Sequence, residues 1–158
     1  MTKTVCFTGH RDIPQENYLA LKEALTQEIE LQIQEGATVF RAGGALGFDT
    51  LAALCVLDLR RKHPNVRLEL ILPCPTQTRG WSPSEKGLYQ QILQQADAYR
   101  YVSTTYFSGV LQMRNLALVK DADVCIAYLH SSHGGGTAFT CAQAIKNGLE
   151  LINLGERF

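Results

Sequence analysis

The sequence has no excess of charge of either sign, and this balance bears on which partners it can hold. Fifteen basic and fifteen acidic side chains leave a formal net charge of zero. Proteins that hold long nucleic acids by their phosphates usually carry a clear basic excess, because phosphate contacts dominate that affinity. The balance argues against a nonspecific DNA-binding protein and is compatible with a local basic pocket.

Long apolar runs and a cysteine framework are also missing. No stretch approaches the roughly 20 apolar residues that span a bilayer. The first strand is expected within four residues of the start, so we expect no signal peptide. The five cysteines are scattered, odd in number and without a CxxC pair, and most lie in apolar segments, where free cysteine acts as a small hydrophobic residue. These absences predict a reduced, cytoplasmic protein without disulfides or a membrane span.

Metal ligands in a recognisable spacing are absent as well. His130 and His133 lie near Cys125 and Cys141 in the sequence, but their spacing matches no tight zinc-ligand set. Strand alternation is expected to bury both cysteines. No Walker-type Gly-Lys-Thr segment is present either. We therefore expect no metal and no cofactor.

What the chain does have is a regular alternation of short β-rich runs and helical stretches. Its 158 residues, 46% of them hydrophobic, suffice for one domain with a sizeable core. The predicted strands are 4–8, 37–41, 66–73, 99–103, 124–129 and 149–154. The predicted helices run from after Pro14 to Gly36, over 48–62, from a cap at Ser82 or Ser84 to Ala96, over 109–121, and from the turn 130–136 through Asn147. The alternation predicts an α/β, Rossmann-like doubly wound fold over residues 1–158, with a mainly parallel sheet and helices on both faces.

A run of glycines opens the last predicted helix. Gly134, Gly135, Gly136 and Thr137 directly follow an apolar strand. Ligands of such sheets bind at the carboxyl ends of strands, where successive glycines let backbone N–H groups approach an anion and the helix N-terminus adds partial positive charge. A phosphate-binding turn and an ordinary flexible turn with a threonine cap are equally compatible with this spacing.

A second glycine-rich turn lies between the second strand and the next helix. Gly43, Gly44 and Gly47 allow a tight turn with close approach of a ligand. Asp49 falls in the first helical turn, where it either contacts a ribose or base or acts as a helix cap. Taken alone, the cap is the favoured interpretation. Two glycine turns in one small sheet favour a binding site more than either does separately.

The first strand is followed by Gly9, His10 and Arg11. A guanidinium at this edge can bind two phosphate oxygens at once, although a solvated surface pair is the alternative.

Arg114, next to Asn115, lies near a helix start, where the helix dipole does not favour a cation. This placement makes Arg114 a stronger ligand-binding candidate than an ordinary surface charge.

The long polar loop before the third helix carries the one tryptophan of the chain. Trp81 lies near Gln77. Trp81 either stacks on a ligand base or fills the edge of the core, and the sequence favours neither.

Taken together, these segments resemble the YpsA-like branch of the SLOG superfamily. The motifs occur in matching order over nearly the whole chain: Cys6-Phe7-Thr8-Gly9-His10-Arg11, Gly43 to Asp49, Gln77 with Trp81, Met113-Arg114-Asn115, and Gly135-Gly136-Thr137. The resemblance implies a Rossmann-like fold that binds or senses a nucleotide-derived ligand, ADP-ribose-like or an adenine nucleotide. It also implies a homodimer formed through helices, which the apolar helical faces permit.

The superfamily has two better defined branches, which supply the alternatives. LOG-type phosphoribohydrolases release a base from a nucleoside monophosphate, and the DNA-processing protein A group binds single-stranded DNA. The LOG-type pattern Gly-Gly-x-Gly-Thr-x-x-Glu ends in a glutamate where this chain has Thr140. Because ribosyl transfer passes through a cation-like sugar, hydrolysis here would need Asp49 or Glu85 as the carboxylate, with Arg114 orienting the phosphate. The zero net charge disfavours single-stranded DNA binding.

Overall fold

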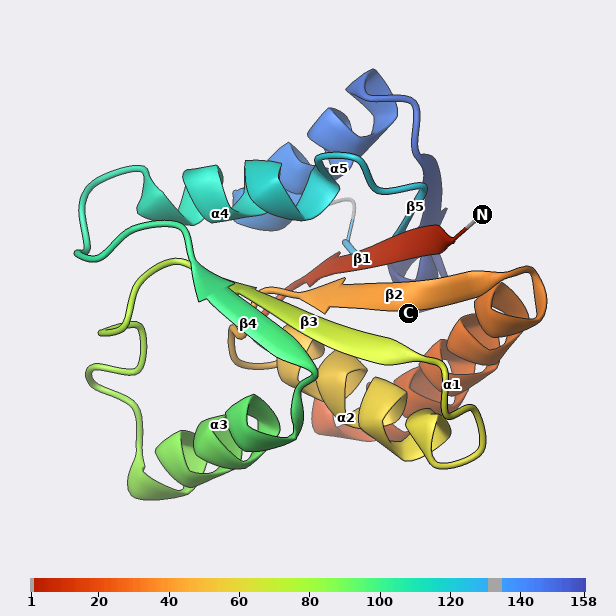
Figure 1. The fold of residues 1–158 in the computed structure, drawn as a ribbon, viewed down its shortest axis with the longest axis horizontal. Coiled ribbons are helices and arrows are strands. Elements are labelled where there is room, and N and C mark those ends of the chain that lie inside the picture. The colour runs from red at the N-terminus through yellow and green to blue at the C-terminus, as the bar shows by residue number, and fades with distance from the viewer. Residues whose placement is uncertain (1, 131–134) are drawn as a thin grey trace.

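The sheet and its helices are seen in a computed structural model that describes residues 2–130 and 135–158 (Figure 1). Within these residues, six parallel strands form one sheet in the order β4-β3-β2-β1-β5-β6. The strands are β1 (Lys3–Gly9), β2 (Ala37–Ala42), β3 (Arg67–Leu72), β4 (Ala98–Tyr101), β5 (Val124–Tyr128) and β6 (Glu150–Asn153). The helices are α1 (Tyr18–Gln34), α2 (Phe48–Arg60), α3 (Pro83–Gln95), α4 (Val110–Val119) and α5 (Gly136–Lys146), with short 3-10 helices η1 (Gln15–Asn17) and η2 (Leu154–Arg157). The Rossmann-like α/β fold expected from the sequence is confirmed.

The differences from the predicted boundaries have local causes. The helix predicted over 109–121 ends at Val119, because the backbone leaves the helical region at Lys120 (ψ 122°) and Asp121 then adopts a left-handed backbone (φ 61°). The third helix starts at the Ser82 cap, where Ser82 Oγ accepts from the Glu85 N–H and the Glu85 carboxylate accepts from the Ser82 N–H. This capping box satisfies amides that a helix start otherwise leaves unpaired.

Helices cover the sheet on both faces. α1, α2 and α3 lie on one face and α4 and α5 on the other (Figure 1). The larger core cluster includes Phe7, Phe40 and Phe48, and the smaller one includes Cys6 and Leu118. Every residue of the central strand β5 is buried, which explains its continuous apolar sequence. All five cysteines are buried and free.

The winding direction of the sheet reverses between β1 and β5. The crossovers through α1, α2 and α3 lead stepwise from β1 to the edge strand β4, whereas α4 crosses the opposite face to reach β5 (Figure 1). The loops after β1 and β5 therefore diverge at the carboxyl ends of two neighbouring strands, where Gly9 lies beside Tyr128. Such a switch point is where open α/β sheets bind ligands.

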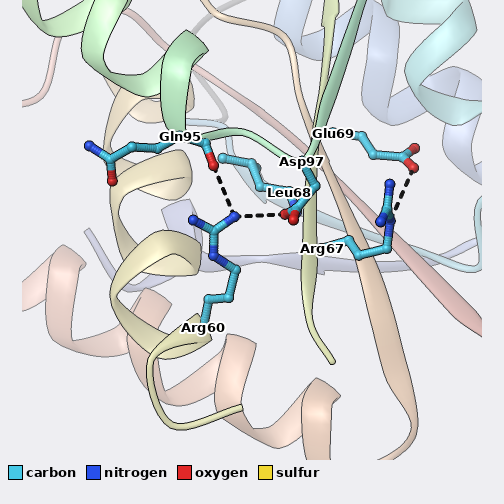
Figure 2. Close-up of polar contacts among 6 residues, drawn as sticks. All are labelled: Arg60, Arg67, Leu68, Glu69, Gln95 and Asp97. Carbon is cyan, nitrogen blue, oxygen red and sulfur yellow. Dashed lines mark hydrogen bonds and ion pairs between the residues drawn. The ribbon is translucent and has the colours of Figure 1, made fainter. Parts of the chain in front are cut away.

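The edge strand β4 is anchored by a carboxylate at its N-terminal end. Asp97 Oδ2 accepts hydrogen bonds from the Leu68 N–H and from Arg60 Nη1, both at 2.8 Å (Figure 2). Arg60 Nη1 also donates to the Gln95 carbonyl oxygen at 2.9 Å. Burial acts to raise the pKa of Asp97, but the Leu68 N–H and Arg60 outweigh burial and hold the pKa below its usual value. One side chain thus connects β4, β3 and α2.

We expect Asp97→Ala to lower the free energy of unfolding by about 1–2 kcal/mol, because it leaves two hydrogen-bond donors without their acceptor. Urea denaturation at neutral pH measures the loss. Glu69→Ala is the matched control, because Glu69 Oε2 lies 4.0 Å from Arg67 Nε in a partly exposed pair without a backbone N–H donor (Figure 2), and surface pairs contribute about 0–1 kcal/mol. Equal losses in the two variants would show that Asp97 does not anchor the strand.

Candidate functional site

A cavity of about 350 Å³ lies at the switch point between β1 and β5. Its volume falls within the usual range of small-molecule sites. Segments far apart in the sequence line it: Phe7, Thr8, Gly9, His10 and Arg11 from the end of β1, Ala45 and Asp49 from the turn into α2, Leu111, Arg114, Asn115 and Leu118 from α4, and Gly136 and Thr137 from α5. Residues from four predicted site segments therefore meet in one place.

Two glycines allow α2 to start directly against the turn after β1. A Cβ on Gly9 would lie 2.4 Å from the Phe48 ring, and a Cβ on Gly47 would lie 2.1 Å from the Arg11 carbonyl oxygen. Gly47 also has a φ of +81°, which strains any other residue. The Phe48 N–H donates to the His10 carbonyl oxygen at 3.1 Å. These glycines shape the wall of the cavity by close packing.

Gly43 lies between the two buried charges of the site. A Cβ at Gly43 would lie 2.9 Å from Arg114 Nη1 and 2.9 Å from Asp49 Oδ2. The Gly43 carbonyl oxygen accepts a hydrogen bond from Arg114 Nη1, and the Ala45 N–H donates to Asp49 Oδ2 at 3.3 Å. The turn between β2 and α2 therefore holds a carboxylate and a guanidinium close together at the cavity.

Arg114 is only 5% exposed, although it lines the cavity. Its Nε donates to Asn115 Oδ1 at 2.8 Å, in addition to the bond from Nη1 to Gly43. Burial lowers the pKa of Arg114, and the charge of Asp49 acts in the opposite direction. An arginine stays protonated even so, and its planar fork has further N–H donors. Arg114 is thus a fixed, partly desolvated cation suited to binding an anion.

Asp49 is the one carboxylate among the described residues that line the cavity, and it is 5% exposed. Burial raises its pKa to about 6 from an ordinary 3.8, against the opposing effects of Arg114, the Ala45 N–H and Arg11. A carboxyl with a pKa near neutrality can exchange a proton at physiological pH. The side chain does not cap α2, because its oxygen accepts from Ala45 rather than from an amide of the helix.

The raised pKa of Asp49 predicts a pH dependence of stability. Between pH 3.8 and about 6 the folded protein keeps a proton on Asp49 that the unfolded chain has lost. The stabilisation that comes from binding this proton is therefore fully present below pH 3.8 and is lost as pH rises through about 6. We expect the free energy of unfolding of the wild type, relative to Asp49→Asn, to fall by up to about 3 kcal/mol between pH 4 and pH 7. Parallel urea denaturation of both proteins measures it, and a difference that does not change with pH would contradict the burial of the carboxyl.

His10 joins the turns after β1 and β5. The backbone N–H of His130 donates to His10 Nε2 at 3.0 Å, so a neutral His10 carries its proton on Nδ1. The two imidazole rings stack with centroids 5.8 Å apart, and His130 Nε2 lies 2.9 Å from the Tyr128 hydroxyl. His10 lines the cavity and also fixes the direction in which the chain leaves β5.

Only the end of the glycine turn that opens α5 lines the cavity. Gly136 and Thr137 line it, and a Cβ on Gly136 would lie 3.6 Å from Asn115 Nδ2. Gly135 precedes the helix with a φ of +87°. Gly134 lies outside the described residues. The first turn of α5 therefore presents its N-terminal end to the same space as Arg114, as anion binding requires.

The remaining predicted residues lie outside this cavity. Gly44 packs against Leu72, and Gln77 lines a neighbouring cavity. Trp81 packs on the main core, edge-on to Tyr89 with ring centroids 5.5 Å apart. Of the two interpretations of the tryptophan, its packing in this structure corresponds to filling the edge of the core.

Sequence reasoning did not single out Leu111 and Leu118, which form the apolar wall beside Arg114. The sequence did contain a signal for them, because positions 111, 114, 115 and 118 have the spacing of one helical face.

Glu85, considered as a substitute carboxylate, is instead engaged in the capping box of α3. Thr140 is fully buried, and its hydroxyl donates to the Gly136 carbonyl oxygen at 2.9 Å.

Residues 2–130 and 135–158 contain neither a cluster of metal-binding side chains nor a membrane-spanning helix. No group of three or more His, Cys, Asp or Glu side chains is arranged to hold a metal ion. No helix in this part of the chain is both long enough and apolar enough to cross a bilayer.

Comparison with known sequences gives consistent matches. The YpsA family model, described as the YspA SLOG family, matches residues 6–151. The SPbeta prophage-derived protein YoqJ of Bacillus subtilis is 39% identical over 130 residues, which cover 74% of this chain and 76% of YoqJ. The UPF0398 protein BH1768 of Halalkalibacterium halodurans is 28% identical over 121 residues, or 75% of this chain. The chain spans only 64% of the length of that UPF0398 relative.

Solved structures with the same fold are more distant in sequence. DNA processing protein A from Helicobacter pylori, studied for its single-stranded DNA binding mode, superposes with a TM-score of 0.63 at 18% identity, over 94% of this chain and 63% of that one. The structural-genomics target TM1055 superposes with a TM-score of 0.60 at 18% identity, over 98% of this chain and 79% of that one. At such identity the likeness concerns the fold.

Proposed function

This chain belongs to the YpsA family of SLOG proteins, and from that premise we propose that it binds or senses a nucleotide-derived ligand, an adenine nucleotide or an ADP-ribose-like molecule. The ligand occupies the cavity between the ends of β1 and β5. Its phosphate lies between Arg114 and the first turn of α5, and its sugar lies toward Asp49.

One observation carries the proposal: a buried guanidinium lines a cavity at the switch point of the sheet. Keeping a cation away from water is costly unless it meets an anion or several acceptors. Gly43 and Asn115 accept two hydrogen bonds from Arg114 and Asp49 lies nearby, but the planar fork keeps further N–H donors that an anion in the cavity can accept. With Arg11 at the rim and the start of α5 opposite, the cationic groups of the cavity favour a phosphate.

Calorimetric titration of the purified protein with AMP, ADP, ADP-ribose and inorganic phosphate tests the proposal. We expect at least one nucleotide to bind more tightly than inorganic phosphate, because the cavity also offers the apolar walls of Leu111 and Leu118 to the rest of the ligand. A folded protein that binds none of these compounds would contradict the proposal.

A second candidate function is hydrolysis of an N-glycosidic bond, and Asp49 favours it. A carboxylate in a cavity with a bound ribose phosphate can stabilise a cation-like sugar, the role that Thr140 cannot fill. Asp49 would act on the sugar while Arg114 orients the phosphate. Chromatography of AMP incubated with the protein detects free base. Release that is lost in both Asp49→Asn and Arg114→Ala supports hydrolysis, and no release leaves binding as the function.

Single-stranded DNA binding is the third candidate, supported by the fold shared with DNA processing protein A. The neutral net charge weighs against it, since binding along a DNA backbone relies on many cationic contacts. A mobility shift that weakens steeply with salt would favour DNA over a small nucleotide.

A further inference from the structure

A second cavity of about 450 Å³ lies next to the first. Residues of the loop between β3 and α3 and of the segment leading into α4 form it, and Arg11 and Leu111 belong to the walls of both cavities. Its other lining residues are Pro73, Cys74, Thr76, Gln77, Arg79 and Tyr106. A ligand that begins in the first cavity can therefore extend into the second past Arg11.

The side chains of the second cavity suit a planar, hydrogen-bonding group. Tyr106 is 66% exposed and lines this cavity, so its ring is open to a ligand. An exposed ring in a cavity wall is a platform on which a nucleobase can stack. Arg79 is also exposed on this wall, and Gln77 offers an amide with both donor and acceptor atoms.

One backbone carbonyl connects a lining residue of the first cavity with a lining residue of the second. The Gly43 oxygen accepts from Arg114 Nη1 on the side of the first cavity and from Gln77 Nε2, at 3.4 Å, on the side of the second. Gln77 Oε1 in turn accepts from the Tyr89 hydroxyl at 3.3 Å, and Trp81 packs edge-on to Tyr89. The loop that carries Gln77 and Arg79 is thus held in place relative to the phosphate site.

Arg11 occupies the junction. It is exposed, it lines both cavities, and its charge acts on the buried pair Asp49 and Arg114. A guanidinium placed between two subsites, with a second guanidinium in one of them, suits two linked phosphates better than one.

We propose that the ligand is a two-part nucleoside diphosphate of the ADP-ribose type. Its diphosphate lies between Arg114 and Arg11, and its base lies in the second cavity against Tyr106. This inference rests on the proposed function and narrows it, because a bare sugar phosphate has no base for the second cavity and a single phosphate cannot contact both guanidinium groups as two linked phosphates can.

Titrations with ADP-ribose and ribose 5-phosphate test the inference, because only the first probe has a base. We expect Tyr106→Ala to weaken ADP-ribose binding about tenfold and to leave ribose 5-phosphate binding unchanged. Tyr106→Phe keeps the ring and should retain the wild-type affinity. Tyr99→Ala is the matched control, because Tyr99 is 51% exposed on β4 and lines neither cavity.

The outcomes separate the two proposals. If wild-type protein binds both probes and Tyr106→Ala leaves ADP-ribose binding unchanged, or weakens both probes equally, the second cavity holds no base and the inference fails while the proposed function stands. If the folded wild-type protein binds neither probe nor any other nucleotide, the proposed function itself fails. Tyr106 is exposed, so its replacement is not expected to affect folding, and a circular dichroism spectrum identical to that of the wild type verifies this.

Discussion

Arg114→Ala is expected to weaken ADP-ribose binding by at least about tenfold, because it removes a charge-assisted hydrogen bond of about 1.5–3 kcal/mol from the phosphate. The alanine also leaves Asp49 buried without its nearest cation, so the pKa of Asp49 should rise further above about 6. Calorimetry measures the affinity.

Two further variants make the Arg114 result specific. Arg114→Lys keeps the charge without the planar fork, so its affinity should fall between those of the wild type and the alanine variant. Arg100→Ala removes an exposed arginine that lines neither cavity and should bind as the wild type does. A folded Arg114→Ala protein with affinity within twofold of the wild type would remove Arg114 from the binding site.

Gly47→Ala is expected to reduce the free energy of unfolding by more than about 3 kcal/mol or to prevent folding. A left-handed backbone costs an alanine about 1–2 kcal/mol. The new methyl group would also lie 2.1 Å from the Arg11 carbonyl oxygen, a backbone atom that cannot move without shifting the turn after β1. Thermal and urea denaturation measure the loss.

Gly36→Ala is the matched control for the backbone cost. Gly36 also has a left-handed backbone, with a φ of +100°, but a Cβ there meets nothing within 4 Å. It should cost only about 1–2 kcal/mol. The difference between the two variants reports the close approach of α2 to Arg11 together with the more extreme backbone of Gly47, whose ψ is −120°. If Gly47→Ala is no worse than Gly36→Ala, the two segments are not packed as described.

Much of the fold follows from local patterns in the sequence. Periodicity and glycine or proline breaks located most strands and helices to within a residue or two, because these elements form from local preferences. The exception is the start of α1, which was predicted after Pro14 and lies at Tyr18, behind the short helix η1. The general location of the site also followed, since turns after parallel strands must meet at one edge of the sheet. Leu111, by contrast, required recognising which face of α4 points inward.

The inner geometry of the site depends on contacts between distant residues, which local patterns do not encode. Gly43 and Arg114 are 71 positions apart, and only the folded sheet places the guanidinium on that carbonyl. The same holds for Trp81, whose packing against Tyr89 and the main core depends on the folded structure. The role of Gly47 likewise became clear only when Arg11 was seen beside it.

The central claim is that an anion is held between Arg114 and the start of α5. Nuclear magnetic resonance titration with ADP-ribose tests it most directly, by following the backbone amides and the Arg114 side-chain Nε–H. The largest shifts should fall on Gly136, Thr137, Arg11 and the Arg114 Nε–H, whereas amides of the edge strand β4 should remain unchanged. Saturating ADP-ribose that shifts other regions and leaves these four signals in place would contradict the claim.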